Sequence, residues 1–523
     1  MCYGFRVNKP LPTRITLRLG LDDADDDAAL QEAAAKKLGV PVSELPPLTL
    51  AKRAIDARGR EVRFELVLDI GAEPSSLGGA LPRPLDGDAK VIIVGDGPAG
   101  LFCAYELARR GVRSIVLERG KQVQPRRRDL AQLNRGSDVP TESNYCFGEG
   151  GAGTYSDGKL YTRANKRGNV RDILEILALH GAPARILTDA RPHIGSNLLP
   201  KVVTALRERL EECGVEFHFN TKVTSLLAED GQMQGVVTED GTEYLAAHVV
   251  LATGHSGRDV WRMLQEIGAP MTPKAFALGV RIEHPQALIN EVQYGRSAGH
   301  PKLPAAYYSV KAQVSDERAV FSFCMCPGGF IVPAATERES VVVNGMSLTK
   351  RASPFANSGL VVSVSPEQWE AAGHTGVFGG VDLQRSLEAA AFQHGGGASV
   401  APATRVTDFL AGRPSSTVPT TSYQPGLYAT DIAPVLDAAG LPLAEALREG
   451  LNQLDKKVRG YITEDAVLVG VETRTSAPLR IERDEELQSP GLAGLYPAGE
   501  GAGFAGGIIS AALDGVRIAA VIA

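Results

Sequence analysis

Apolar and polar positions alternate over residues 13–19 and 62–70, which is the two-residue period of half-buried strands. Between them, an acidic run at 22–27 opens a helical pattern that ends at Gly39, a residue suited to a helix C-cap. We interpret the acidic run as a solvated helix N-terminus favoured by the helix dipole, rather than as a metal or partner site. The pattern predicts a small α/β module, and residues 71–88 have the composition of a linker.

The pattern changes at Ala89, where four β-branched apolar residues, Val91 to Val94, predict a buried parallel strand. A glycine-rich turn follows, and the apolar positions from Leu101 to Ala108 then form one face of a helix. A second strand ends at Glu118, and strands and helices continue to alternate up to about residue 270. This order is typical of a Rossmann-type dinucleotide-binding domain that carries a small β insertion.

The rest of the chain predicts a second kind of domain and a return to the first. Several β-like runs and a few helical stretches occupy 271–454 and favour a mixed α+β substrate domain. The last segment again reads as strand, glycine-rich turn and helix. We therefore expect an α/β protein with four parts: an N-terminal α/β module with its linker (1–88), a first FAD-binding part (89–270), a substrate domain (271–454) and a return to the FAD-binding domain (455–523).

Composition narrows the class of protein. Of 523 residues, 44% are hydrophobic and 22% charged, which suits a folded globular chain. With 55 basic against 61 acidic residues, no basic footprint points to nucleic acid or to an anionic membrane, and neither is expected as a partner. The six cysteines are too scattered for a disulfide framework, which favours a reducing, cytoplasmic location. The 57 glycines exceed the roughly 37 expected at average usage.

Some of these glycines form a phosphate-binding motif. Gly95, Gly97 and Gly100 stand as G-x-G-x-x-G between the predicted strand and helix, and Glu118 follows 18 residues after the last of them. The first glycine permits a tight turn, the second lets a pyrophosphate approach the backbone, and the third lets the helix pack on the strand. The carboxylate suits the ribose hydroxyls of an adenine dinucleotide. The strand, helix and acid together predict dinucleotide binding.

The bound dinucleotide is indicated by resemblance. VGDGPAGLFCAYELA (94–108), VVLATGHSG (249–257) and GLYPAGEGAGFAGGI (494–508) together resemble the three-part FAD signature of glutathione-reductase-type flavoproteins. In that family the first piece holds the ADP half, the second lies beside it, and the third contacts the ribityl chain and flavin ring. The resemblance implies FAD as the cofactor; NAD(P)H, if it takes part, would bind transiently, because the chain has no second G-x-G-x-x-G for a nicotinamide domain.

Longer motifs narrow the resemblance. The segments 147–163, 193–199, 279–286, 323–330, 342–347 and 472–484, with the C-terminal motif, are similar to a family of largely uncharacterised FAD-dependent dehydrogenases. That family implies a fold and a cofactor, but its substrates are not generally established. The cofactor-binding residues that we expect are Gly95, Gly97, Pro98, Ala99, Gly100, Glu118, Arg119, Gly150, Gly151, Gly153, Thr154, Ser156, Asp157, Ala252, Thr253, Gly254, Gly499, Glu500, Gly506, Gly507 and Ile508.

Physical reasons also place two of these regions, the glycine-rich loop and the C-terminal motif, at the cofactor. Five glycines between 148 and 158 leave the backbone free to approach a flat or charged group, so we place this loop at the pyrophosphate and flavin edge, with a plain surface loop as the alternative. Glu500 stands where the flavoprotein pattern has an aspartate that binds the ribityl chain. The helix that begins after Gly507 would direct its positive end at the reduced flavin.

Five residues are candidates for catalysis. Cys324 and Cys326 form C-x-C, where an extended strand would hold the two side chains about 7 Å apart, so inert packing or a single active thiol is favoured over a disulfide, and no zinc or other metal site is expected. Lys159 could stabilise negative charge on a flavin, or could simply be solvated. Arg474 could clamp a carboxylate, with an ion pair to Glu472 or Glu482 as the alternative. His193 could transfer a proton or be structural.

The sequence therefore predicts a cytoplasmic FAD-dependent oxidoreductase that moves a hydride between flavin N5 and an unidentified small molecule at the interdomain cleft. Two alternatives remain: an FAD-dependent monooxygenase, and a flavin redox sensor or scaffold without turnover. The sequence leaves the oligomeric state and the role of the N-terminal module open.

Overall fold

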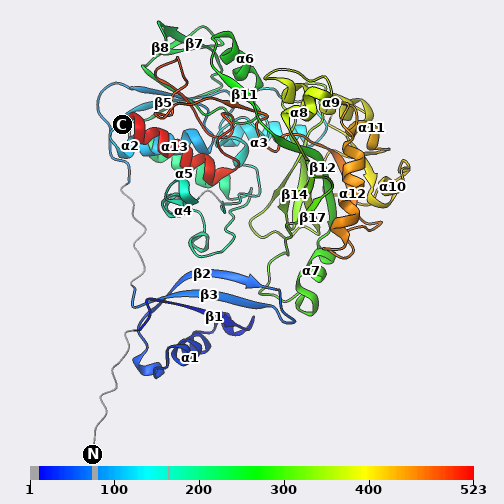
Figure 1. Ribbon diagram of the computed structural model, residues 1–523. Helices are drawn as coiled ribbons and strands as arrows, with labels where there is room; N and C mark the ends of the chain where they lie inside the picture. Colours follow the sequence, from blue (N-terminus) through cyan, green and yellow to red (C-terminus); the bar gives the residue numbers. More distant parts are fainter. Residues whose placement is uncertain (1–10, 73–80, 163–164, 398) are drawn as a thin grey trace, which may run out of the picture.

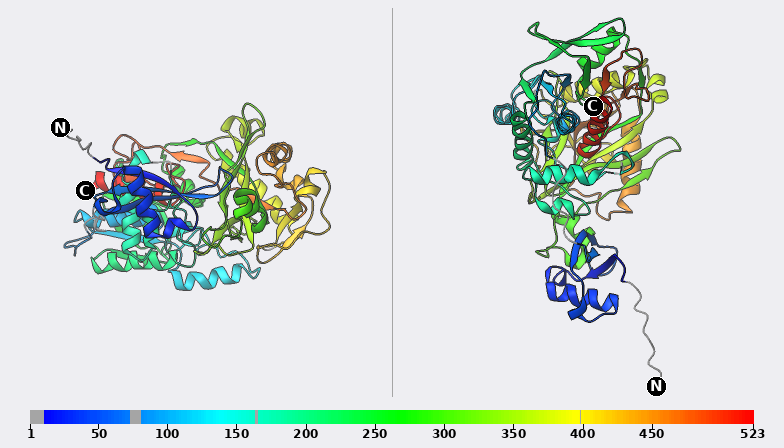
Figure 2. Two further views of the ribbon diagram at one scale, coloured as in Figure 1. Left: turned by 90° about the horizontal axis from the view of Figure 1, so that it is seen from below. Right: turned by 90° about the vertical axis from the view of Figure 1, so that its left-hand side faces the viewer.

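The computed structural model describes residues 11–72, 81–162, 165–397 and 399–523. The N-terminal module is a three-stranded antiparallel sheet, in the order β1-β3-β2, with helix α1 packed on one face. It projects from one end of the larger body (Figures 1 and 2) and contacts it where the backbone of Arg53 pairs with Thr188 and Ala190. Its elements are β1 (Arg14–Leu19), α1 (Asp27–Leu38), β2 (Leu48–Asp56) and β3 (Arg63–Ile70).

The helix start and end in this module agree with the sequence. The carboxylate of Asp26 caps α1 by accepting the backbone N–H groups of Ala28 and Ala29. Gly39 closes the helix with φ 73°, and its N–H bonds to the carbonyl of Ala35. The end of the acidic run, Asp26 and Asp27, is therefore a helix N-terminus, as predicted, whereas Asp23–Asp25 form a short 3-10 helix before it. Strand β2 was not predicted, because its sequence LTLAKRAID lacks a clear two-residue alternation.

The larger body contains a five-stranded parallel sheet in the order β22-β10-β4-β5-β6. Its central strand, Val91–Val94, is buried on both faces: Val91 and Ile93 pack under one layer, Ile92 and Val94 under the other. This is the predicted Rossmann-type core. The strands are β4 (Val91–Val94), β5 (Ser114–Glu118), β6 (Glu216–Phe219), β10 (His248–Leu251) and β22 (Leu495–Pro497).

Helices cover this sheet, and two of them, α2 and α13, come from segments that lie far apart in the chain. Helices α2 and α13 lie side by side in Figure 1, in close contact, because a Cβ added at Gly515 would lie 2.0 Å from the carbonyl oxygen of Ala99. The helices around the sheet are α2 (Pro98–Arg109), α3 (Val123–Leu133), α4 (Val170–Leu179), α5 (Leu199–Glu212), α6 (Arg258–Glu266) and α13 (Ile508–Ile522). The predicted β insertion is the sheet of β7 (Val223–Glu229), β8 (Gln232–Thr238) and β9 (Glu243–Leu245).

A seven-stranded mixed sheet forms the second core, in the order β13-β14-β17-β12-β20-β18-β19. Strand β20 (Val467–Glu472) lies within this sheet, although it falls in the segment 455–523 that we expected to return to the first domain. The other strands are β12 (Phe276–Pro285), β13 (Lys311–Gln313), β14 (Ala319–Cys326), β17 (Phe355–Val364), β18 (Ala401–Arg405) and β19 (Leu427–Ala429).

Short elements complete this half of the molecule. Two strand pairs lie beside the large sheet: β11 (Met271–Pro273) with β21 (Leu479–Ile481), and β15 (Gly329–Pro333) with β16 (Val343–Ser347). Its helices are α7 (Gln286–Tyr294), α8 (Pro366–Ala371), α9 (Gly379–His394), α10 (Val406–Leu410), α11 (Ala433–Leu436) and α12 (Leu443–Asp455). None of the helices in the described ranges combines the length and apolar character needed to cross a bilayer.

Candidate functional site

One cavity of about 380 Å³ collects the motifs that the sequence analysis singled out from distant parts of the chain. Its volume lies in the range of small-molecule and cofactor sites. Among the predicted residues, its lining includes Gly95, Gly97, Pro98, Ala99, Glu118, Arg119, Gly151, Gly153, Ser156, Asp157, Lys159, Ala252, Thr253, Gly254, Cys324, Arg474, Glu500, Gly506, Gly507 and Ile508.

Close backbone approach shapes the start of α2. Gly95 has φ 104°, and a Cβ there would lie 2.5 Å from the carbonyl oxygen of Ala252. A Cβ on Gly151 would lie 3.0 Å from the Cα of Gly97, so the glycine-rich loop lies directly against the turn. The first N–H groups of α2 have no partners within the helix. The result is a side-chain-free surface at a positive helix end, which suits a phosphate.

Glu118 ends strand β5 at this cavity and organises three backbone segments. It is 5% exposed, and one carboxylate oxygen accepts the N–H of Asp96 at 3.0 Å. The other oxygen accepts the N–H groups of Gly120 and Gly148, each at 2.9 Å. A carboxylate oxygen can accept more than one donor, so Glu118 retains acceptor capacity toward the cavity. It therefore joins the first turn, its own strand and the loop after α3.

The glycine-rich loop is fixed from behind by a buried arginine. Arg126 is fully buried, and its guanidinium donates to the carbonyls of Asn144, Tyr145, Glu149 and Gly151. All of these acceptors are backbone carbonyls, so Arg126 fixes the loop without requiring any side chain from it. Nothing in the sequence distinguishes Arg126 from a surface arginine, because it stands in a polar helix.

Four residues that we expected at the cofactor do not line the cavity. Gly100 and Gly150 lie behind it, because added Cβ atoms would meet the carbonyl of Gly95 at 2.0 Å and the hydroxyl of Thr154 at 2.1 Å. Thr154 is buried and donates to the carbonyl of Glu149, and the N–H of Gly499 donates to Asp514. These residues shape the backbone under the site, and their direct contact with a cofactor stays a prediction.

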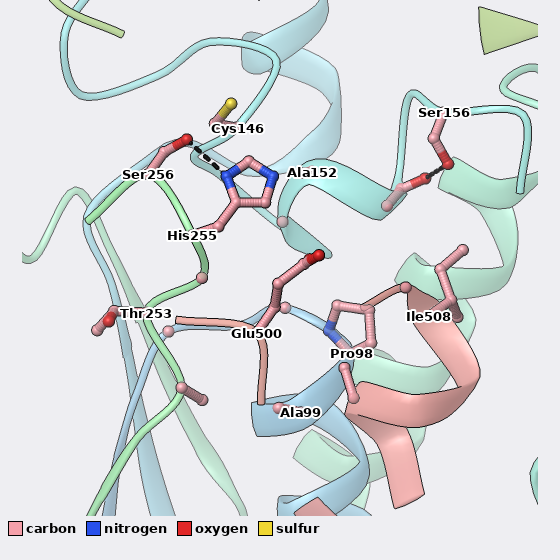
Figure 3. A pocket seen from close by; sticks show the side chains of 18 of the residues that line it. Pro98, Ala99, Cys146, Ala152, Ser156, Thr253, His255, Ser256, Glu500 and Ile508 are labelled. Atoms are coloured by element: carbon pink, nitrogen blue, oxygen red, sulfur yellow. Dashed lines mark hydrogen bonds between the residues drawn. The ribbon is translucent and has the colours of Figure 1, made fainter. Parts of the chain in front are cut away.

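The C-terminal motif forms another wall of the cavity. Figure 3 shows Glu500 extending toward the space that the ring of His255 also faces, with Ile508 at the start of α13 nearby. Burial raises the pKa of Glu500 to about 7, although Lys274 opposes this shift. Gly506 and Gly507 also line the cavity, and added Cβ atoms at either would meet nothing within 4 Å. Their missing side chains therefore leave open space at the positive end of α13.

The C-x-C segment lies in the same cavity. Cys324 is exposed, and Lys159 places its ammonium nitrogen 3.5 Å from the Cys324 sulfur and 3.8 Å from that of the buried Cys326. The sequence alone predicts an extended strand for this segment. Strand β14 instead shifts register between Phe323 and Cys326, and Cys324 has φ 44°. The estimate of about 7 Å for a regular strand therefore does not apply here.

Charged groups that the sequence analysis did not propose surround these thiols. Arg281 is fully buried and donates to Glu472, to Asn357 and, at 2.7 Å, to the Cys324 carbonyl. Gly345 makes room for it, since a Cβ there would lie 2.2 Å from the guanidinium. Both residues occur in segments that carry the family resemblance, and this was the only sequence feature that could have pointed to them.

Asp157 lines the cavity, and its carboxylate is engaged by a cationic partner. Arg351 donates to it at 2.5 Å, and Ser347 also hydrogen-bonds it. Burial alone would raise the pKa of Asp157, but the charges of Lys159 and Arg351 outweigh it and lower that pKa to about 2. Asp157 is therefore an ionised residue that anchors the loop to the end of β16 and the residues after it.

Arg474 is held by a buried ion pair, and its partner is neither of the two predicted. Its guanidinium donates to Glu388 at 3.1 and 3.0 Å, and Arg258 donates to the same carboxylate at 2.8 and 3.0 Å. Glu472 pairs with Arg281 instead. Two cations lower the pKa of Glu388 to about 2 against the effect of burial. Arg474 lines the cavity with its donors already engaged, so it is a poor clamp for a substrate carboxylate.

The histidines divide between the cavity and the core. His193 does not line the cavity; its ring contacts the carbonyl of Thr349 at 3.1 Å, and burial lowers its pKa to about 4. His255 does line it and hydrogen-bonds Ser256, as the dashed line in Figure 3 marks. Burial lowers its pKa to about 4 as well. Of the two, only His255 could face a bound molecule.

Family comparisons agree with this arrangement. Residues 88–135 match an FAD binding domain, 199–312 match a model described as FAD dependent oxidoreductase, and 275–475 match a model described as FAD-dependent protein, C-terminal domain-like. Residues 12–71 match a domain of unknown function. The chain is thus a flavoprotein of the FAD-dependent oxidoreductase class. It belongs to the same family as an uncharacterized protein from Clostridium beijerinckii, with 41% identity across 96% of this chain and 97% of that protein.

Solved structures that resemble the chain are distant. L-proline dehydrogenase from P. horikoshii shares 14% identity over 84% of this chain and 94% of its own, with a TM-score of 0.34. A crystal structure of CtdE in complex with FAD shares 13% identity over 83% of this chain and 84% of its own, with a TM-score of 0.33.

Proposed function

We propose that the chain is an FAD-dependent dehydrogenase or reductase that transfers a hydride between the flavin and a small-molecule substrate in the cavity described above. The observation that carries this proposal is the lining itself. Three segments of the flavoprotein pattern, the glycine-rich loop with Lys159, and Cys324 of the second sheet all line one cavity.

The residues present fit FAD on two structural grounds. The cavity follows two helix N-termini, those of α2 and α13, where anionic groups are favoured. Gly97, Gly151, Gly506 and Gly507 line it without side chains, so that the backbone is accessible. We assign the pyrophosphate to the start of α2, the ribose hydroxyls to Glu118, the ribityl chain to Glu500 and the flavin ring to the start of α13, in the manner of glutathione-reductase-type flavoproteins.

When bound, FAD supplies the hydride-accepting or hydride-donating centre. The chain's own residues would then bind and orient both molecules. The N-terminus of α13 favours negative charge at its end of the cavity. Lys159 adds a positive charge to the cavity lining. Cys324, Glu500 and His255 also line the cavity and could exchange a proton with a bound substrate.

The division of the chain into an FAD-binding unit and a substrate unit is also a proposal. We propose that the FAD-binding unit comprises 89–270 and the final segment, and that the substrate unit extends past residue 454 to include β20, which pairs with β12 and β18. NAD(P)H, if it takes part, would reach this cavity transiently.

Anaerobic photometric titration of the FAD-loaded protein tests the proposal. NADH, NADPH and a panel of reduced metabolites are added in turn while the flavin absorbance is followed. Bleaching by one class of donor, with hydride transfer confirmed by deuterium labelling of that donor, supports a dehydrogenase. In a parallel aerobic assay, oxygen consumption with substrate hydroxylation would instead indicate a monooxygenase. Flavin inert to every donor would indicate a sensor.

A further inference from the structure

The ammonium group of Lys159 lies beside the sulfur atoms of Cys324 and Cys326. Neither cysteine is among the residues proposed to bind FAD. Cys324 is exposed, whereas Cys326 lies fully buried behind it. The Cys326 thiol is 3.3 Å from the Cys324 carbonyl oxygen and within hydrogen-bonding reach of the Cys324 sulfur. An accessible thiol backed by a second, shielded thiol is the arrangement of an attacking and a resolving cysteine.

The backbone at this point is unusual in a way that brings the thiols together. Cys324 adopts φ 44°, a left-handed conformation that a residue with a Cβ rarely takes. The register of β14 against β17 shifts between Phe323 and Cys326, which marks a bulge. Arg281 donates to the carbonyl of Cys324 at 2.7 Å and so holds the bulge in place. Backbone strain maintained by a buried arginine indicates that this geometry serves a function.

The charges around the pair favour a thiolate at Cys324. Lys159 lies 3.5 Å from its sulfur, and Arg281 lies 3.6 Å from the sulfur of Cys326. The hydrogen bond from Cys326, with these two cations, lowers the pKa of the Cys324 thiol, while the same hydrogen bond and burial raise that of Cys326. The carboxylates of Asp157, Glu472 and Glu500 act on the pair in the opposite sense. Cations beside a partly exposed thiol are the recognised setting of a reactive cysteine.

We propose that Cys324 and Cys326 form a thiol–disulfide couple that exchanges with small-molecule disulfides entering this cavity. The Cys324 thiolate attacks one sulfur of the substrate, whose S–S bond breaks to release a thiolate, and a mixed disulfide forms. The Cys326 thiol then attacks the Cys324 sulfur, forms the Cys324–Cys326 disulfide and gives its proton to the second leaving thiolate. The substrate gains two electrons and the cysteine pair loses two.

A disulfide substrate is favoured over a carbon electrophile because of Cys326. An addition at carbon needs a single nucleophile, whereas thiol exchange also needs a resolving thiol at the position that Cys326 occupies. The inference rests on the proposed function only in taking this cavity as the substrate site. The exchange itself involves protein thiols alone, so it can be measured with or without bound flavin.

Glutathione disulfide is the probe for a first experiment on the full-length protein, followed by acid quenching and peptide mass spectrometry. The wild type is expected to form the Cys324–Cys326 disulfide, and Cys326→Ser to retain glutathione on Cys324. Cys103, which is fully buried, serves as the internal reference. Absence of both products, or glutathione distributed equally over other cysteines, would overturn the proposal, while retained FAD would show that the cofactor assignment stands separately.

A second experiment measures the rate of Cys324 alkylation by iodoacetamide against pH. Lys159→Gln is expected to raise the pH midpoint by about one unit or more, because a cation near the thiolate is lost. Lys159→Arg should restore most of the shift, and Lys201→Gln, at an exposed position on α5, should have no effect. Identical profiles for the wild type and Lys159→Gln would show that Lys159 does not act on this thiol, and a wild-type midpoint no lower than that of a free thiol would overturn the proposal.

Discussion

The ammonium nitrogen of Lys159 lies 3.5 Å from the sulfur of Cys324, although 165 positions separate the two residues in the chain. Lys159 belongs to the glycine-rich loop beside the parallel sheet, and Cys324 to a strand of the second sheet. Their contact brings the proposed cofactor cradle and the proposed substrate side into one cavity.

Gly97→Ala is expected to weaken FAD binding while leaving the fold intact. The added Cβ would meet only the Cα of Gly151, at 4.0 Å, yet it stands where the pyrophosphate is proposed to lie. We expect a rise of about tenfold or more in the dissociation constant, or about 1.4 kcal/mol, measured by flavin fluorescence. Gly111→Ala, at the other end of α2, is the matched control: its φ of 80° makes the substitution costly for stability, and FAD affinity should not change.

Glu118→Ala is expected to reduce both stability and FAD binding. Three backbone N–H groups, those of Asp96, Gly120 and Gly148, would lose their acceptor. Buried donors left unpaired in this way should cost about 3 kcal/mol in urea-induced unfolding of the apoprotein. Glu118→Gln keeps one acceptor oxygen, so its stability should lie between that of the wild type and that of the alanine variant. A fully stable alanine variant would contradict the organising role of this carboxylate.

Glu388→Gln should destabilise the protein at neutral pH and lose this effect in acid. The carboxylate pairs with Arg258 and Arg474, and removing one partner of a buried ion pair costs about 3 kcal/mol or more. Its pKa is about 2 when folded against a reference value of 4.5. Its stabilisation is therefore present above pH 4.5 and disappears as the pH falls toward 2.

Urea unfolding at a series of pH values would show the variant and wild-type curves converging in acid. Glu337→Gln is the comparison: its side chain is partly exposed and pairs with Arg385 and with Arg258, so this substitution should cost less than Glu388→Gln. Parallel curves for Glu388→Gln and the wild type down to pH 3 would be incompatible with the ion-pair assignment.

Glu500→Gln should remove a pH dependence near neutrality. Burial raises the pKa of Glu500 to about 7 in the folded protein, above its reference value of 4.5. The folded apoprotein therefore loses stability as the pH rises from about 4.5 through 7, because the ionised carboxylate must be buried. The glutamine variant should show a flatter profile in thermal unfolding between pH 5 and 8, whereas Glu485→Gln, at an exposed position, should follow the wild type.

Local patterns were sufficient to predict much of the fold. The buried run Val91 to Val94, the G-x-G-x-x-G turn and Glu118 define a strand–helix–strand unit by local rules, and the structure has it. The acidic run and Gly39 likewise define the ends of α1. These features depend on neighbours in sequence, which is why they can be predicted.

Contacts between distant segments could not be predicted in the same way. The partner of Arg474 is Glu388, on a helix of the second half, and no spacing rule connects them. The bulge at Cys324 is held by Arg281 from β12, a strand that β17 separates from β14 in the sheet, so a period-two pattern alone described β14 as regular. Gly100, Gly150, Thr154 and Gly499 were correctly placed in the motifs, but only packing shows that they lie behind the cavity.

The most direct test of the central proposal is a crystal structure of the protein loaded with FAD. We predict the pyrophosphate at the start of α2 near Gly97, and the flavin ring at the start of α13 near Gly507, on the side of the cavity that Lys159 and Cys324 line. FAD bound elsewhere on the protein, or bound here with its adenine in place of the flavin ring, would contradict the account.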